Sequence, residues 1–221
     1  MERALVVGAS GGIGAAVVAE LAKRSVAVTG LSRSGDELDV TDEASVAAHL
    51  GALDGPFDLI FVATGALVID GAEPEKAVKQ VTAEALANQY ILNAIGPMLV
   101  LKHALPLIPR DRRAVFAALS ARVGSIGDNG LGGWHSYRAA KAGLNQLIHG
   151  AAIELKRSHK QAIAVCLHPG TVATNFTAKY AAAHKTVPPS DAAANLVDVV
   201  AGLTPAQSGG VFDYAGRDIP W

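Results

Sequence analysis

The stretch Ala4-Leu-Val-Val-Gly-Ala-Ser-Gly-Gly-Ile-Gly14 decides the fold. Its first four residues, Ala4–Val7, are all apolar and predict a buried strand. Apolar residues at helical spacing begin among the glycines and continue over Ile13–Arg24. A strand that meets a glycine-rich turn and then a helix is the context that a dinucleotide-binding fingerprint requires. A plain glycine-rich turn is the alternative, but the position at the first strand–helix junction favours a nucleotide.

Each glycine of this turn has a predicted use. Gly8 permits the sharp turn, Gly12 lets the backbone approach a pyrophosphate, and Gly14 allows the helix to pack closely on the strand. The N-terminus of the helix adds unpaired N–H groups and a partial positive charge, which together favour a phosphate. The predicted phosphate loop is completed by Ser10, Gly11 and Ile13.

Short apolar runs alternate with helical patterns along the chain, and we find no linker or internal repeat. Further strands are expected at Val26–Leu31, Leu38–Val40, Leu59–Ala63, Ala114–Leu119, Ile163–Leu167 and Gly210–Tyr214. Further helices are expected at Thr41–Leu50, Ala83–Leu105, Tyr137–Lys156 and Asp191–Ala201. This alternation predicts a parallel sheet covered on both faces. We therefore expect one α/β domain with a Rossmann-type, doubly wound sheet of about seven strands.

Composition argues against several classes of protein. The 221 residues carry a formal net charge of −1, so no global basic field attracts nucleic acid or an acidic membrane. The single cysteine, Cys166, lies in an apolar run and is expected to be a core side chain, with a reactive thiol as the alternative. The first apolar run is too short for a signal peptide, and no stretch is expected to approach the roughly 20 residues of a membrane span. We expect a cytoplasmic protein without a metal site.

The end of the second strand, Leu31-Ser32-Arg33-Ser34, bears on the choice of cofactor. An acidic residue there binds the ribose 2′-hydroxyl of NAD, whereas an arginine suits the 2′-phosphate of NADP. Arg33 can bind a phosphate in bidentate fashion, and Ser32 can add a hydroxyl donor. The sequence therefore favours NADP(H) over NAD(H). Asp36 could still place a carboxylate near the ribose, and Arg33 could be only a surface charge.

Asp39 and Val40 follow at the end of the expected third strand. Asp39 could accept from the adenine amino group while Val40 covers the ring. Asp39 could equally cap the next helix, for which Thr41 and Asp42 are the other candidates.

Tyr137 and Lys141 lie four residues apart on an expected helix and so share one face. A free tyrosine has a pKa of about 10, which is too high for efficient proton exchange at neutral pH. A lysine cation one turn away, with a positive nicotinamide, lowers that pKa. Tyr137 could then protonate a carbonyl oxygen as hydride arrives, and Lys141 could also hold the nicotinamide ribose. The spacing is common by chance, so the alternative is two residues on an amphipathic helix.

Several motifs follow one another in a recognisable order: Gly8–Gly14, Asn93, Ser120, Tyr137 with Lys141, and Pro169-Gly170. With this set the chain resembles the short-chain dehydrogenase/reductase superfamily over nearly its whole length. Residues 119–126, 132–141 and 212–221 are more narrowly similar to its C-factor/sniffer branch. That branch is typically described as small carbonyl reductases, with some members linked to signalling or stress. The resemblance implies reduction of a small aldehyde, ketone or quinone.

The resemblance also assigns roles to residues outside the catalytic pair. Asn93 matches the helix asparagine that holds a water linking Lys141 to solvent, although it could simply kink its helix ahead of Pro97. Ala63-Thr64-Gly65 stands where the family usually has Asn-Ala-Gly beside the adenine ribose. The segment expected to meet the nicotinamide carboxamide, unless it is an ordinary turn, contains Pro169, Gly170, Val172 and Thr174.

The catalytic serine departs from the family pattern. It is normally the second serine of a pair, but here the pair is Ser120-Ala121. Neighbours on a strand face opposite ways, so Ala121 takes the side expected to face the substrate. Either the strand end rotates and Ser120 faces inward, or Ser125 reaches back from the loop. If neither acts, Tyr137 alone hydrogen-bonds the transition state.

Other segments shape the expected site. The connection between Arg33 and Leu38 is too short for the usual helix. Residues 175–189, a short segment, would form the substrate lid, which suggests an open site and broad choice of carbonyls. Lid side chains that could contact a substrate are Phe176, Tyr180, His184 and Lys185. Trp134 and His135 are expected at the same mouth, while structural roles are preferred for His135 and His168.

Three functions compete at this point. The first is an NADP(H)-dependent carbonyl reductase, which the full motif set favours. The second is a catalytically weak, NADP(H)-binding signalling or sensor protein, suggested by the missing second serine. The third is a structural oligomer with a relic cofactor site. By analogy with relatives, we expect a homodimer formed through 83–105 and 137–156.

Overall fold

The computed structural model describes residues 1–174 and 186–221. Within these residues, six parallel strands form one sheet in the order β2-β1-β3-β4-β5-β6. The strands are β1 Arg3–Val7, β2 Ala27–Leu31, β3 Leu59–Val62, β4 Ala114–Leu119, β5 Ala162–His168 and β6 Val211–Asp213. The α/β fold with a doubly wound parallel sheet is the one that the sequence predicts.

The expected strand at Leu38–Val40 is wrong, and this leaves six strands in place of seven. The segment instead takes part in two turns. Leu38 N donates to Ser32 O at 3.3 Å, and Thr41 N, just after the segment, donates to the Asp39 carboxylate at 2.8 Å. The connection before it does hold a helix, a single turn from Arg33 to Asp36 (α2). The expectation of no helix there is therefore also corrected.

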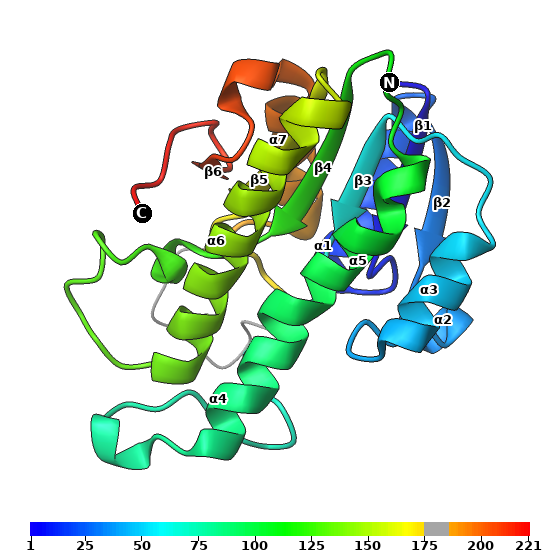
Figure 1. Cartoon of the computed structure of the whole chain (residues 1–221). Coiled ribbons are helices and arrows are strands. Elements are labelled where there is room, and N and C mark those ends of the chain that lie inside the picture. The colour runs from blue at the N-terminus through cyan, green and yellow to red at the C-terminus, as the bar shows by residue number, and fades with distance from the viewer. Residues whose placement is uncertain (175–185) are drawn as a thin grey trace.

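Helices cover both faces of the sheet, as Figure 1 shows. On one face lie α1 Gly12–Lys23 and α7 Pro189–Gly202, and on the other lie α3 Glu43–Gly51, α5 Gly96–Ala104 and α6 His135–Ser158. α4 Ala83–Tyr90 runs through a π-helical turn, η2 Ile91–Ile95, into α5. The remaining short helices are η1 Val78–Gln80, η3 Leu105–Leu107, η4 Arg122–Gly124 and η6 Pro205–Gln207.

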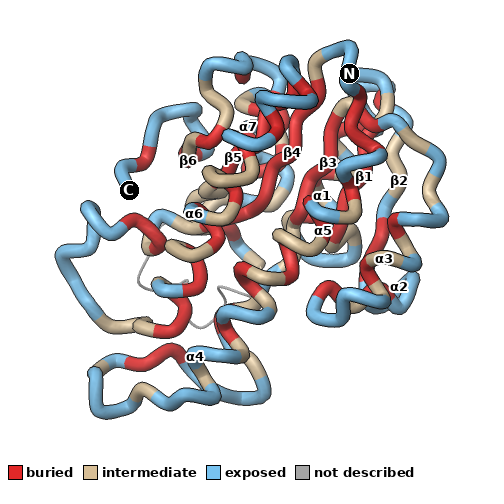
Figure 2. The backbone as a smooth tube through the Cα atoms, in the orientation of Figure 1, coloured by how far each residue is buried: buried red, intermediate tan, exposed pale blue. Residues whose placement is uncertain are grey.

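The core has two halves, one on each face of the sheet. Figure 2 shows the central strands β3 and β4 in red, the colour of buried residues. Along β4, Phe116 packs with the helices α3, α5 and α6, while Val115 and Ala117 pack with α1 and α7. Alternate residues of a strand face opposite ways, so a strand covered on both faces must be apolar throughout. Cys166 is part of this core, buried in β5.

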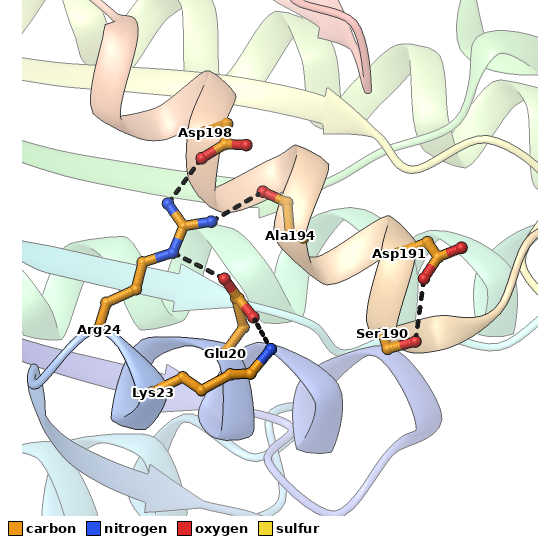
Figure 3. Close-up of polar contacts among 7 residues, drawn as sticks. All are labelled: Glu20, Lys23, Arg24, Ser190, Asp191, Ala194 and Asp198. Atoms are coloured by element: carbon orange, nitrogen blue, oxygen red, sulfur yellow. Dashed lines mark hydrogen bonds and ion pairs between the residues drawn. The ribbon is translucent and has the colours of Figure 1, made fainter.

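Charged contacts join α1 to α7 at the surface (Figure 3). Arg24 donates from Nε to Glu20 at 2.7 Å and from Nη1 to Asp198 at 2.6 Å. Its other terminal nitrogen lies 3.5 Å from the carbonyl oxygen of Ala194. Exposed ion pairs of this kind contribute only about 0–1 kcal/mol each, so apolar burial dominates the packing of these two helices.

One helical stretch of the described chain, Ala83–Leu107, is long and apolar enough to span a membrane by length and composition alone. This corrects the expectation that no stretch approaches that length. The stretch lies across one face of the sheet, and Ala94, Val100, Leu101 and Ala104 are buried there in the core. Core helices pass the same test, so the finding carries little weight for a membrane.

The order of the strands reverses at β1. The chain leaves β1 for β2 on one side and returns for β3 on the other. In such sheets ligands bind outside the carboxyl ends of the strands where the order reverses. The glycine-rich turn after β1 and the segment Ala63-Thr64-Gly65 after β3 both lie at this point.

Candidate active site

The turn after β1 needs glycine at three positions. Gly8 has a φ of +88°, and its N–H donates to Leu31 O at 2.8 Å. A Cβ on Gly14 would lie 2.1 Å from the carbonyl oxygen of Gly8. A Cβ on Gly12 would lie 2.6 Å from Cγ2 of Thr174. Only glycines therefore let α1 begin this close to β1 and let Thr174 lie over the turn.

Two features of this region fit a dinucleotide. Gly11 caps α1 without a side-chain hydrogen bond, so no cap side chain occupies the N–H groups that could bind an anion. The hydroxyl oxygen of Thr64 is buried and has no hydrogen-bond partner within the described chain. A buried hydroxyl normally has a partner, so this one suits a ligand such as a ribose hydroxyl. Ser10 is exposed in the glycine-rich turn, and Ile13 lies in the first turn of α1.

The turn after β2 presents Arg33 to solvent as the first residue of α2. Ser32 caps this helix by accepting a hydrogen bond from Gly35 N at 3.0 Å. The Asp36 carboxylate lies 2.8 Å from Ser32 N and 3.3 Å from Ser32 Oγ. Asp36 is thus engaged with Ser32, while Arg33 is exposed in the same turn.

Asp39 and Val40 follow this turn. One carboxylate oxygen of Asp39 accepts from the Thr41 N–H at 2.8 Å and the Thr41 hydroxyl at 2.7 Å. These two hydrogen bonds, with a smaller effect of the Arg33 charge, lower the pKa of Asp39. Val40 is buried, and Gly96 of α5 packs directly against it. The cap of α3 is Asp42, which accepts from Ala44 N at 3.0 Å.

Tyr137 lies in the first turn of α6, and Lys141 lies one turn further along. Both side chains are buried, and the ammonium nitrogen of Lys141 is 5.8 Å from the centroid of the Tyr137 ring. Lys141 also donates to Leu119 O at 2.9 Å. Burial raises the pKa of Tyr137 above its usual value and lowers the pKa of Lys141 to about 8. Desolvation therefore outweighs the expected lowering of the tyrosine pKa in the ligand-free protein.

Asn93 lies in the π-helical turn η2, a distortion that often marks functional sites. Its amide nitrogen donates to Ala66 O at 2.9 Å and to the Gln89 side chain at 2.7 Å. A Cβ on Gly65 would lie 2.7 Å from the Asn93 side-chain oxygen and 3.5 Å from the Lys141 ammonium nitrogen. Asn93, Gly65 and Lys141 therefore lie close together, just past the C-terminal end of β3.

The two candidate serines are both buried but differ in their hydrogen bonds. The Ser120 hydroxyl donates to the side-chain oxygen of Asn145 at 2.7 Å, so its proton is directed at α6. The Ser125 hydroxyl oxygen accepts from Asp128 N at 3.1 Å. Within the described residues the Ser125 proton has no acceptor, and its oxygen is held in the loop that leads to Tyr137.

The segment after β5 passes over the glycine-rich turn. Gly170 has a φ of +79° and packs against the ring of Tyr214. Val172 is buried, and the backbone of Val187 is hydrogen-bonded to Thr171 and Ala173 at 3.0 and 2.9 Å. These bonds close the base of the expected lid. Residues 175–185 of that lid, which include Phe176, Tyr180, His184 and Lys185, lie outside the described residues.

The two histidines and the tryptophan near the site differ in surroundings. Burial lowers the pKa of His168 to about 4, so this side chain is neutral at physiological pH. The ring of Trp134 is T-shaped to that of Tyr137, with centroids 6.3 Å apart. His135 begins α6 and is half-buried.

Known proteins share this arrangement over most of the chain. A family model described as enoyl-(acyl carrier protein) reductase, of the short-chain dehydrogenase type, matches residues 8–201. The chain belongs to the short-chain dehydrogenase/reductase superfamily. The 1-hydroxy-2-glutathionyl-2-methyl-3-butene dehydrogenase of Rhodococcus sp. is 31% identical over 187 residues, 83% of this chain and 78% of that protein. The C-signal of Myxococcus xanthus is 33% identical over 62% of this chain and 78% of its own.

Solved structures of other short-chain dehydrogenases have the same fold. A short-chain dehydrogenase/reductase from Burkholderia multivorans with bound NADP is 29% identical, with a TM-score of 0.85 over 100% of this chain and 99% of that one. The carbonyl reductase Sniffer of D. melanogaster, 20% identical with a TM-score of 0.81 over the whole of both chains, shows the shared fold.

Three polar residues of this short-chain dehydrogenase were missed from the sequence. Asn145 holds Ser120 and extends the four-residue spacing of Tyr137 and Lys141 by one turn, so the spacing itself was a signal. Gln89 is likewise one turn before Asn93, which it contacts. Glu75 is buried and accepts from Ser136 N at 3.2 Å at the start of α6, although it lies 61 residues earlier. No local pattern reveals such a contact.

Proposed function

We propose that this short-chain dehydrogenase is an NADP(H)-dependent carbonyl reductase that converts a small aldehyde, ketone or quinone to an alcohol. The observation that carries the proposal is the buried pair Tyr137 and Lys141 at the point where Asn93 and Gly65 meet. This pair of residues lies at the same edge of the sheet as the glycine-rich turn. A single buried phenol beside a cation suits proton donation to a developing alkoxide.

The residues of this chain would act in a definite order. Bound NADPH would supply the hydride. Tyr137 keeps its proton at neutral pH because burial raises its pKa, and it would donate that proton from its hydroxyl to the carbonyl oxygen. Lys141 would hold the nicotinamide ribose and pass a proton toward Tyr137, and Asn93 would hold the water that leads to solvent. Ser125 would hydrogen-bond the carbonyl oxygen, since its proton is uncommitted.

Cofactor binding would use residues at the ends of four strands, β1, β2, β3 and β5, and in the segment between α2 and α3. Gly8–Gly14 would hold the pyrophosphate, Ser32 and Arg33 the 2′-phosphate, and Asp39 and Val40 the adenine. Ala63, Thr64 and Gly65 would contact the adenine ribose, while Pro169, Gly170, Val172 and Thr174 would meet the nicotinamide. The Burkholderia relative, at 29% identity, has bound NADP. The exposed Arg33 supports the same cofactor here.

The test is oxidation of NADPH in the presence of a panel of aldehydes, diketones and quinones. We expect turnover of part of the panel and its loss in Tyr137→Phe, with NADPH binding retained. NADH should be the poorer cofactor. Turnover that persists in Tyr137→Phe would reject the assigned proton donor, and absence of turnover with every compound would reject the reductase.

A catalytically weak, NADP(H)-binding signalling protein is the second candidate. The similarity to the M. xanthus C-signal and the alanine at position 121 favour it. Micromolar NADPH binding with no reductase activity on the panel would distinguish it from the reductase.

Assembly and location remain proposals. We propose a homodimer through α4–α5 and α6, supported by apolar side chains that these helices leave exposed: Leu86, Tyr90, Ile91, Leu105 and Ile153. We also propose a cytoplasmic location, a single domain with a lid around residues 175–189, and no nucleic-acid, membrane or metal partner. The described residues contain no cluster of three metal-ligating side chains.

A further inference from the structure

The single-turn helix α2 is tied to α3 by one histidine. His49 Nε2 lies 2.7 Å from Asp36 O, and His49 Nδ1 lies 2.7 Å from Ser45 O. Both partners are backbone carbonyl oxygens, which only accept hydrogen bonds. A neutral imidazole has one N–H, whereas the imidazolium has two. His49 can therefore donate to both carbonyls only when it is charged, whereas a neutral ring keeps one of the two contacts. The Ser45 hydroxyl, 3.4 Å from Nδ1, is a further partner for that nitrogen.

The surroundings of His49 favour that charge. The hydrogen bonds to Ser45 and Asp36 raise the pKa of His49 above its ordinary 6.5, and the carboxylates of Asp36 and Glu37 add to this against the opposing effect of burial. Asp36 O is also the carbonyl at the C-terminal end of α2, which lacks a partner within the helix and attracts a cation.

Other charged groups on the neighbouring elements are engaged elsewhere. From α5, which packs on α3, Lys102 and His103 contact Glu43 at the opposite end of α3 from His49. Arg33 is on α2 itself, and its charge acts on Asp39.

The bridged turn is the one that carries the 2′-phosphate residues of the proposed function. Ser32 caps α2, Arg33 begins it, and Asp36 ends it. The chain leaves it through Glu37 at a φ of +61°, a conformation that costs a residue other than glycine free energy. With four residues and a strained exit, α2 has little stability of its own and depends on contacts such as His49.

We propose that His49 is a positioning residue that, when charged, holds the Arg33 turn ready for the 2′-phosphate and so makes the preference for NADPH over NADH fall as the pH rises. When His49 loses a proton, the ring can donate to only one of the two carbonyls, and its hydrogen bond to Asp36 O is no longer charge-assisted, so the hold on the end of α2 weakens. The positive charge at the C-terminal end of α2 is lost as well. Neither change affects NADH, which has no 2′-phosphate. This inference rests on the proposed function.

The experiment measures dissociation constants of NADPH and NADH by fluorescence titration between pH 6.5 and 9. Histidine Cε1–H NMR signals report His49 protonation in the same samples. We expect the ratio of the two constants to shift about two- to fivefold against NADPH, the size of one charge at a helix end. Its midpoint should match that of His49.

Two variants isolate the effect. His49→Arg keeps a permanent cation that can donate to two carbonyls, so its preference for NADPH should stay high and independent of pH. His49→Gln should show a low preference at every pH. His103→Gln is the matched control, since His103 pairs with Glu43, and it should behave as the wild type.

The results that overturn the inference differ from those that overturn the proposed function. An unchanged ratio while His49 titrates, or the same decline in His49→Gln, would refute the positioning role although NADPH still binds. Absence of binding by either dinucleotide would refute the proposed function. In that case the bridge is still tested, because a His49 pKa at or below 6.5 by NMR would refute it independently.

Discussion

At the residue scale, the decisive property is the proton on Tyr137. Burial raises the pKa of its phenol and lowers the pKa of Lys141 to about 8. Lys141 is thus charged below about pH 8 and neutral above it, while Tyr137 remains protonated. A protonated Tyr137 suits reduction, in which the tyrosine donates its proton to the substrate. It suits oxidation less, because there the tyrosine must first lose its proton.

We predict that kcat/KM for carbonyl reduction declines as the pH rises through about 8, where Lys141 loses its charge. Alcohol oxidation should instead increase with pH, because Tyr137 must be deprotonated to accept the alcohol proton. Steady-state rates in both directions from pH 6 to 10 test this. In Lys141→Arg the decline in reduction should disappear, since arginine stays charged. A reductive rate that is flat across pH 8 in the wild type would contradict the assignment.

The two serines give a second prediction. Ser125→Ala should lower kcat by about 10²–10³, the typical loss for one donor to a developing oxyanion. Ser120→Ala, which removes only the donor to Asn145, should keep most of the activity. Thermal unfolding of both variants controls for stability. The opposite order of effects would assign the role to Ser120.

Sequence reasoning at this scale found residues whose spacing is local. Tyr137 and Lys141 follow the period of one helix, and the glycines follow one turn. His49 with Asp36, and Glu75 with Ser136, are contacts between separate elements. Such pairs are brought together by packing, so a pattern within one element does not contain them. The burial that raises the pKa of Tyr137 could not be predicted for the same reason, since it depends on the whole site.

At the scale of elements, α1 lies so close to the turn after β1 that position 14 has no room for a side chain. Gly14→Ala should destabilise the protein by roughly 1–3 kcal/mol, as overpacking does, and weaken dinucleotide binding, because its Cβ would lie 2.1 Å from Gly8 O. Gly150→Ala in α6 is the control. No atom lies within 4 Å of its Cβ position, so it should be neutral or stabilise by up to about 1 kcal/mol. Urea unfolding measures both, and equal effects would contradict this packing.

Most elements were predictable because apolar periodicity is a property of consecutive residues. The error at Leu38–Val40 has a physical cause. The segment is apolar enough for a strand, yet its neighbouring residues bond back within turns. β2 remains the edge of the sheet as a result. The single turn α2 escaped notice because four residues are too few to show a helical period.

At the scale of the whole molecule, the exposed apolar side chains of α4, η2 and α6 should be covered in a dimer. We predict a dimeric mass by light scattering and a shift toward monomer in Ile91→Lys, which would bury a charge in the interface. Val78→Lys is the control, since Val78 is also exposed but lies outside these helices. A monomeric wild type would reject the proposed interface.

The measurement that tests the account most directly is NADPH consumption with a panel of carbonyl compounds by the wild type and by Tyr137→Phe, with NADPH binding measured in parallel. The account predicts turnover by the wild type, loss of nearly all turnover in Tyr137→Phe, and similar NADPH affinity in both. Equal rates in the two proteins, or NADPH binding without any turnover by the wild type, would contradict it.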